Sequence, residues 1–215
     1  MLFIQRKLLL NSLCFLVLFF CACTQQDQTE YFQTLAAKRL QLNESFFDRT
    51  QSPLDSASFK HFTGLKFYPV NPGYKVMAEL EPIADTGIFE LLHSHQITRP
   101  YKFFAKAHFS LMGKKYALMI LEQAVKKEGN ENYLFIPFTD DTNGDQTYGG
   151  GRYIDCVKPG ENAPHGNQIE IDFNLAYNPY CAYNDSYFCP IPPKENALPL
   201  KVVAGMKYDP SEFGR

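Results

Sequence analysis

The chain has 215 residues, of which 45% are hydrophobic and 15% aromatic, and its formal net charge at pH 7 is −2. This length and apolar content suit one globular domain, and the near-neutral charge excludes the basic surface that nucleic-acid binding requires. The aromatic residues are 19 Phe and 13 Tyr without any Trp. Large rings that pair across strands favour a β-rich core.

Residues 1–22 have the pattern of a secretory signal peptide. Arg6 and Lys7 supply the positive charge, and an almost wholly apolar run follows over Leu8–Phe20. The run is too short for a stable membrane span and is flanked as a signal is. We therefore expect this segment to direct export and to lie outside the fold.

The end of that segment resembles a bacterial lipobox, in which a small residue precedes the cysteine that is lipidated. Ala22 stands directly before Cys23, which makes Cys23 the expected lipidation site and Cys21 the weaker choice. Residues 23–29 then form a short polar tether. We predict attachment to a membrane of the bacterial cell envelope, on its periplasmic side or at the cell surface. Ordinary cleavage or an uncleaved anchor is the alternative.

One long helix is predicted over residues 27–47. Its apolar positions recur near the 3.6-residue helical period. They are Tyr31, Phe32, Leu35, Ala36, Leu42 and Phe46. Lys38 and Arg39 are placed on the opposite face, and Pro53 ends the helical region.

From Gly64 onward, short alternating segments predict β-strands, with a hairpin turn at Gly113-Lys114. The segments are 65–70, 74–80, 88–92, 101–111, 116–123, 133–138, 152–157, 169–174 and 198–204. Turn signals every 8–12 residues are typical of a sandwich or barrel. We predict a mainly β (α+β) fold, an antiparallel β barrel or sandwich with the N-terminal α-helix packed against it, in one domain over residues 30–215.

Polar, aromatic, glycine and proline residues crowd into three motifs in the last third of the chain. They are Phe138–Tyr153, with three glycines before its arginine, then Ile171–Cys181 and Cys189–Pro193. In this order they resemble the DUF1684 family of bacterial and archaeal proteins, which has no assigned function. The resemblance covers most of the chain after the signal and is sharpest from Phe135 to Gly205. It implies an ordinary member with an added export signal, and it implies no reaction.

The acidic turn within the first motif matches a calcium loop only at its start. Asp141, Asn143 and Asp145 have the opening spacing of an EF-hand loop. Gln146 then stands where glycine is needed, and Arg152 stands where a bidentate acid is needed. We therefore predict no metal and no cofactor here, and expect a turn in which Asp and Asn side chains bond their own backbone; a calcium loop is the alternative.

Arg152 and Tyr153 should point to opposite faces of their strand. An inward Arg152 requires a carboxylate, and Asp172 or Asp145 are the candidates. Either a structural ion pair or a site that recognises an anionic ligand fits this pattern.

The alternation after residue 168 places Asp172 and Asn174 on one face of a strand. In a barrel they would line a polar interior together with Arg152, Tyr148 and Tyr177, whereas in a sandwich they would form a wet face. The candidate ligand or catalytic residues are Asp140, Asp141, Asp145, Tyr148, Arg152, Tyr153, Asp172, Asn174 and Tyr177.

Cys181 and Cys189 could close a small disulfide loop in an exported protein, worth roughly 2.5 kcal/mol by chain entropy. Cys156 would then remain as a buried thiol. Free structural thiols are the main alternative, and a zinc or nucleophilic role with His165 is the other.

Three functions fit these observations. The first is an envelope protein that binds a small polar or anionic ligand near Asp140–Tyr153 and Asp172–Asn174. The second is a hydrolase-type enzyme in which the same carboxylates act with Arg152. The third is a structural or partner-docking envelope protein without a small-molecule site, whose protein partner the sequence does not name.

Overall fold

The computed structural model describes residues 27–84, 87–160 and 167–213. The predicted signal peptide, the lipidation site Cys23 and His165 lie outside these residues. The chain divides into two units, Met1–Glu44 and Ser45–Arg215. No helix in the described residues combines the length and the apolar content needed to cross a membrane.

The predicted long helix is confirmed over residues 27–47. Leu35 and Phe46 are its fully buried residues, each 1% exposed. Arg39 is half-buried because it follows Leu35 by four residues and so shares its face. The prediction that Arg39 lies on the opposite, exposed face is therefore wrong, although Lys38 is exposed as expected.

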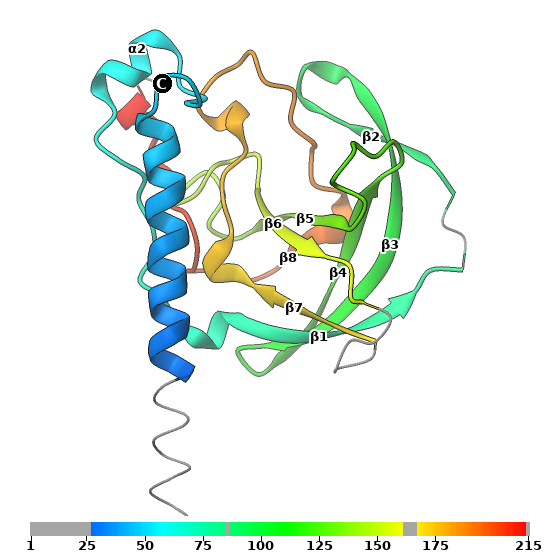
Figure 1. Cartoon of the computed structure of the whole chain (residues 1–215). Coiled ribbons are helices and arrows are strands. Elements are labelled where there is room, and N and C mark those ends of the chain that lie inside the picture. Colours follow the sequence, from blue (N-terminus) through cyan, green and yellow to red (C-terminus); the bar gives the residue numbers. More distant parts are fainter. Residues whose placement is uncertain (1–26, 85–86, 161–166, 214–215) are drawn as a thin grey trace, which may run out of the picture. The chain divides into compact units, whose positions relative to one another are not determined.

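The second unit is built on one curled sheet that forms half a barrel, which confirms the mainly β class (Figure 1). The strands described are β1 (Lys75–Pro82), β2 (Phe89–Leu92), β3 (Thr98–Leu111), β4 (Lys114–Gln123), β5 (Tyr133–Asp140), β6 (Arg152–Val157), β7 (Gln168–Asp172) and β8 (Ala197–Leu198). The main order is β6-β5-β4-β3-β1-β7, with β2 beside β3 and β8 beside β5. The pairs are antiparallel except for β5 with β8.

Short helical turns connect these strands. They are α2 (Ser56–His61), η1 (Pro72–Tyr74), η2 (Ser94–Gln96), η3 (Phe173–Leu175), η4 (Tyr180–Ala182), η5 (Lys194–Asn196) and η6 (Pro210–Phe213). The Asp55 carboxylate caps α2 by accepting from two backbone N–H groups. The predicted hairpin between β3 and β4 is confirmed, but its turn is Met112-Gly113, one residue earlier than the predicted Gly113-Lys114. The φ angles of 50° and 76° at these two residues fit a two-residue turn.

The sheet has two packed faces because successive strand residues point to opposite sides. The inner face carries the main core, with Leu118 and Ile120 of β4 among its members. The outer face carries a smaller cluster of Leu91, Tyr101, Leu121 and Phe135. A register shift between Phe103 and Ala105 in β3 turns Tyr101 to the outer face and the following alanines to the inner one.

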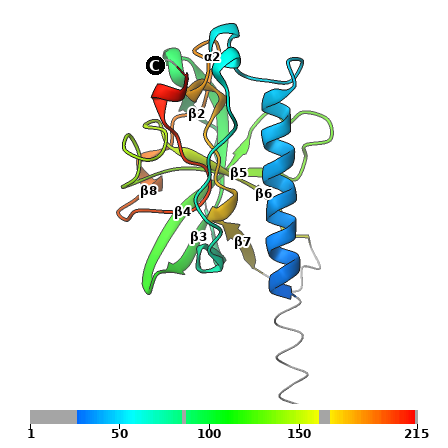
Figure 2. The same ribbon diagram turned by 90° about the vertical axis from the view of Figure 1, so that its left-hand side faces the viewer.

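The C-terminal segment fills the curl of the sheet (Figures 1 and 2). Within the predicted strand 198–204, only Leu198 belongs to a strand, as the end of β8. Val202 and Ala204 are completely buried in the main core. The prediction of a long final strand is wrong because carbonyl groups of this segment bond to a buried arginine rather than to a neighbouring strand. Phe67, in the predicted strand 65–70, makes just an isolated bridge to Met206.

Candidate functional site

Arg152 lies at the start of β6, and its side chain is completely buried on the inner face. Its Nη2 donates to Asp140 Oδ2 at 2.6 Å and to the Val202 carbonyl at 2.9 Å. Its Nη1 donates to the carbonyls of Ala204 at 2.5 Å and Met206 at 3.3 Å. We call this set the Arg152 clamp. It joins the β5–β6 pair to the C-terminal segment.

The clamp corrects the predicted ion pair. An inward Arg152 with a carboxylate partner is what the structure has, but the partner is Asp140, neither Asp172 nor Asp145. Both side chains of the pair are 0% exposed. Gly151 permits this arrangement, since a Cβ there would lie 2.6 Å from the Phe138 carbonyl and 2.8 Å from Pro192.

The acidic turn is a network of internal hydrogen bonds. Asp140 Oδ1 accepts from the N–H of Thr142 at 2.8 Å and from its hydroxyl at 2.6 Å. Asn143 Oδ1 accepts from the Asp140 N–H at 2.6 Å. Asp141 is exposed, and Asp145 lies 3.9 Å from Lys201 with both side chains more than half exposed. Within the described residues, no three His, Cys, Asp or Glu side chains gather as metal ligands would.

Asp172 and Asn174 are buried where β7 ends and η3 begins. Asp172 Oδ1 accepts from the Asn174 N–H at 2.9 Å and from its amide at 3.0 Å. The Asn174 amide in turn bonds both backbone groups of Asn71. The prediction of a continuous strand face here is wrong, because the chain turns after Asp172 and both side chains tie loops together.

The three predicted tyrosines are neighbours that make different hydrogen bonds. Tyr153 points to the outer face, opposite Arg152 as expected, and its hydroxyl donates to the Pro190 carbonyl. Tyr177 donates to Asp155 Oδ1 at 2.7 Å, and Tyr133 donates to the same oxygen at 2.8 Å. Tyr148 lies close to Cys181 and Cys189, and so does Tyr153. The sequence interpretation missed Asp155, although its position two residues after Tyr153 was a signal that both share a face.

The three described C-terminal cysteines are free thiols. Cys181 and Cys189 lie together, since the Cys181 N–H donates to Cys189 Sγ at 3.2 Å. Burial raises the pKa of the nearby Tyr148 hydroxyl, and Cys181 adds to that shift. Cys156 lies in the main core, and burial raises its pKa to about 12.

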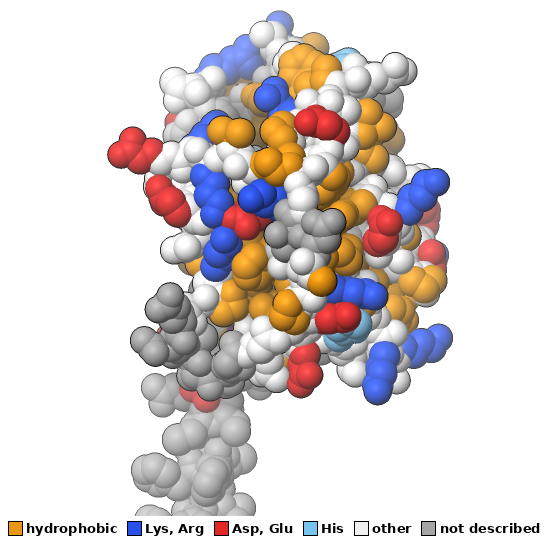
Figure 3. All heavy atoms as spheres, turned by 90° about the vertical axis from the view of Figure 1, so that its right-hand side faces the viewer, with side chains coloured by type: hydrophobic (Ala, Val, Ile, Leu, Met, Phe, Trp, Pro, Cys, Tyr) orange, Lys and Arg blue, Asp and Glu red, His pale blue; other side chains and the backbone are white. Residues whose placement is uncertain are grey.

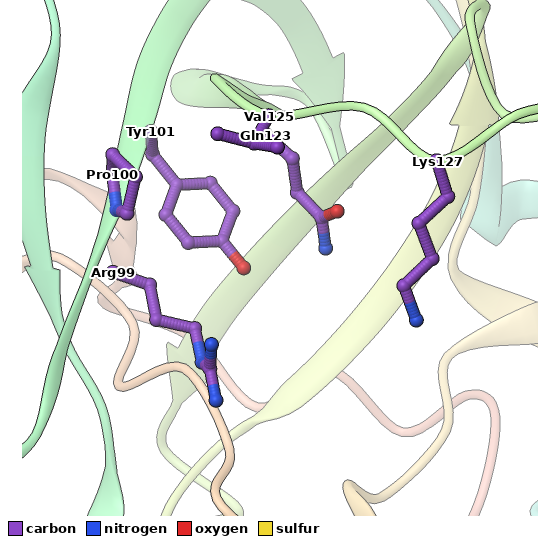
Figure 4. Close-up of a pocket in the computed structure, with 6 residues that line it drawn as sticks. All are labelled: Arg99, Pro100, Tyr101, Gln123, Val125 and Lys127. Carbon is purple, nitrogen blue, oxygen red and sulfur yellow. The ribbon is translucent and has the colours of Figure 1, made fainter.

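A depression of about 480 Å³ lies on the outer face of the sheet, and no predicted site residue lines it. Its described lining consists of Arg99, Pro100, Tyr101, Gln123, Val125 and Lys127. Four of these residues direct their polar ends toward the same open space in Figure 4: Arg99, Tyr101, Gln123 and Lys127. We call this depression the outer pocket. The described lining residues include two cations and no carboxylate.

A second depression, of about 610 Å³, is chemically different. Glu79, His108 and Lys115 lie in its lining, so it presents both signs of charge. The side of the domain with β2 and β3 also carries a band of hydrophobic side chains, flanked by charged ones (Figure 3). Phe89 of β2 stacks on Phe103 of β3, with their ring centroids 4.3 Å apart. Of these two depressions of the described residues, the outer pocket has a single sign of charge and lies beside an apolar surface.

His93 lies beside the outer pocket and predicts a pH-dependent stability. It is 2% exposed, its Nδ1 is 3.0 Å from the Leu91 carbonyl, and its ring centroid is 5.9 Å from that of Tyr101. Burial lowers the pKa of His93 from 6.5, and the charge of Arg99 contributes to the decrease. The unfolded chain therefore binds this proton at a higher pH than the folded chain does.

The contribution of His93 to the free energy of unfolding should be fully present above about pH 6.5. It should decrease as the pH falls below that value, by at most about 1.4 kcal/mol per pH unit. Urea unfolding between pH 7.5 and 5 measures this slope. His93→Gln should flatten the slope. An identical slope in wild type and His93→Gln would contradict the assignment.

The fold and site define a class of protein: a mainly β half-barrel whose C-terminal segment is fixed inside the sheet by a buried arginine–aspartate pair. Residues 60–207 match the family model described as "Protein of unknown function (DUF1684)". The chain belongs to this family, as the sequence motifs indicate.

A solved structure agrees with the assignment. The chain is similar to an uncharacterized protein of Haloarcula marismortui, solved by solution NMR, with 34% identity and a TM-score of 0.66. The match covers 86% of this chain and 97% of that one. No curated protein matches the chain. The comparisons therefore assign the family and the fold without a reaction.

Proposed function

We propose that this protein is lipid-anchored in a cell envelope through Cys23 and binds a small anionic ligand in the outer pocket. The anchor is supported by the apolar run at Leu8–Phe20 and by Ala22 before Cys23. The proposed ligand is of the class predicted from the sequence, but the proposed site consists of other residues. The predicted residues Asp140 and Arg152 already bond to each other and are covered.

The observation that carries the proposal is the convergence of Arg99 and Lys127 on one depression. Cations that face one cavity hold a carboxylate or phosphate through charge-assisted hydrogen bonds, the stronger class of hydrogen bond in proteins. Tyr101 adds a neutral donor, because burial raises the pKa of its hydroxyl. The Gln123 amide can donate or accept.

The pocket also has an apolar part. Pro100, Val125 and the Tyr101 ring belong to its lining, and the volume lies within the usual range for small-molecule sites. Val125 is 74% exposed, so the ligand can reach the pocket from solvent. The site therefore suits an anionic group on an apolar or aromatic body of metabolite size.

Binding of the full chain in detergent micelles to a panel of carboxylates and phosphates tests the proposal by isothermal titration. We expect Arg99→Ala and Lys127→Ala each to raise the Kd about 10- to 100-fold, as for the loss of a charged hydrogen bond. Lys114→Ala, at the start of β4 and far along that strand from Gln123, is the matched control and should leave the Kd unchanged. Equal effects of all three variants, or no binding by any anion, would contradict the proposal.

The hydrolase-type alternative has less support from the geometry. It requires Asp140 and Arg152 to act on a substrate, yet each is fully buried in the clamp. Asp141 and Asp145 are exposed but lie outside the described pocket lining. The structural alternative describes the clamp residues better, since they bond to one another and are covered. It differs from our proposal in having no small-molecule site, so ligand binding in the outer pocket distinguishes the two.

A further inference from the structure

Cys181 and Cys189 are brought together by two separately fixed pieces of chain. Cys181 lies in η4, and its N–H points at the sulfur of Cys189 from 3.2 Å. Cys189 is fixed by Ser94, whose N–H donates to the Cys189 carbonyl at 2.9 Å and whose hydroxyl accepts from the Cys189 N–H at 3.0 Å. The contact between the two cysteines is therefore part of the tertiary structure.

The two sulfurs have different environments. The Cys189 sulfur accepts from the thiol and from the N–H of Cys181, and these bonds lower the pKa of Cys189, the thiol contributing most. The same thiol bond raises the pKa of Cys181. Cys181 is half-buried and Cys189 is 8% exposed. The arrangement favours a thiolate on Cys189 and a protonated thiol on Cys181, at a place that solvent reaches through Cys181.

We propose that Cys181 and Cys189 form a redox-active dithiol that exchanges disulfides with a thiol–disulfide oxidoreductase or with oxidised glutathione. The two hydrogen-bond donors favour the thiolate on Cys189, which is the attacking form in such exchange. The neighbouring Cys181 can then resolve the mixed disulfide. This inference is independent of the outer pocket.

The exchange proceeds in two balanced steps. The Cys189 thiolate attacks one sulfur of the incoming disulfide, which forms a mixed disulfide and releases the other sulfur as a thiol with a proton from solvent. The Cys181 thiol then loses its proton and attacks Cys189 Sγ, which displaces the remaining thiol and forms the Cys181–Cys189 bond. Two electrons and two protons in total pass to the oxidant, so that one disulfide yields two thiols.

Cys156 is the internal control. It lies in the main core, and burial raises its pKa to about 12. Tyr183 and Tyr187 stand between Cys181 and Cys189 in the chain, so chymotryptic peptides separate the two cysteines. Mass spectrometry can therefore follow each thiol of the full chain individually.

The experiment measures iodoacetamide alkylation of the reduced full chain in detergent at pH 7, and then its oxidation in glutathione buffers. We expect Cys189 to react more than about 100-fold faster than Cys156. Oxidation should protect Cys181 and Cys189 together and leave Cys156 free. In the Cys181→Ser variant, Cys189 should remain as a mixed disulfide with glutathione. In the Cys189→Ser variant, little mixed disulfide should form on Cys181.

Three results would overturn the proposal. They are alkylation of Cys189 no faster than that of Cys156, free thiols at both Cys181 and Cys189 across the whole glutathione range, or equal trapping in the two serine variants. Circular dichroism of each variant shows whether the chain is folded. The wild-type alkylation and titration need no substitution, so they decide the outcome even if a variant unfolds.

Discussion

Replacing Arg152 by methionine is expected to lower the free energy of unfolding by about 3–5 kcal/mol. Methionine keeps much of the side-chain volume but leaves Asp140 buried without its cation, and three carbonyls lose their donor. Since domains of this size are stable by about 5–15 kcal/mol, much of the stability should be lost. Urea or thermal unfolding followed by circular dichroism measures the loss.

A double-mutant cycle separates the ion pair from the other contacts of the clamp. Asp140→Asn keeps an oxygen for Thr142 and Val202 but removes the charge, so Arg152→Met with Asp140→Asn should cost less than the two single losses added. Lys201→Met is the matched control, because its ion pair is exposed and should be worth at most about 1 kcal/mol.

The same variants distinguish a structural Arg152 from one that recognises a ligand. If Arg152→Met stays as stable as wild type and loses anion binding, the clamp is a binding site and the structural assignment is wrong. If it is destabilised while its remaining folded fraction binds anions normally, the outer pocket keeps the binding role. The two results cannot both be obtained, because they require opposite stabilities.

Replacing Asn196 by alanine is expected to lower the free energy of unfolding by about 2–4 kcal/mol, since one buried and two partly buried backbone groups lose their partner. The Asn196 Oδ1 accepts from the Met119 N–H at 2.6 Å, and its Nδ2 donates to the carbonyls of Met119 at 2.9 Å and Pro137 at 2.7 Å. The side-chain amide thus bonds β4 to β5, whose described pairing is the single register pair Leu121–Phe135. Urea unfolding measures the cost.

The Asn196→Asp variant tests the donor role of this amide. A carboxylate can still accept from the Met119 N–H but would face two carbonyl oxygens. Its protonated form is then favoured in the fold, so its folded pKa exceeds the unfolded value of about 3.9. The variant should lose stability relative to wild type as the pH rises above that value. Asn130→Ala, in an exposed turn, is the control, and a cost equal to that of Asn196→Ala would contradict the bridging role.

Local patterns predicted the elements that depend on near neighbours. The helical period identified residues 27–47, and strand alternation identified β6 at its observed ends. The same alternation correctly placed Arg152 and Tyr153 on opposite faces. It failed for Asp172 and Asn174, because the chain turns into η3 there and a turn buries both side chains.

The partner of Arg152 depended on strand register, which a long connection does not specify. In the β5–β6 pair, Arg152 stands opposite Phe138, so Asp140 follows two residues later on the same face. Residues 141–151 join these strands and permit several registers. The sequence therefore supplied the correct residue types with the wrong pairing.

The outer pocket left no signal in the sequence. Arg99 and Lys127 are ordinary exposed residues along the chain, and only the pairing of β3 with β4 brings their neighbours Tyr101 and Gln123 opposite each other. No spacing rule relates a cation on β3 to one in the connection after β4. A space-filling surface is needed to find such a site.

The sequence alone determined the mainly β class, the N-terminal helix, the family motifs and an inward arginine that needs a carboxylate. These follow from periodicity and from the high cost of an unpaired buried charge. The tertiary structure alone decided that Asp140 is the partner and that the C-terminal segment covers the pair. It also brought Arg99 and Lys127 together in the outer pocket, on the side of the sheet opposite the Arg152 clamp. The reason is that the burial of a side chain depends on which distant segments of the chain cover it. Strand register and loop closure decide which segments these are.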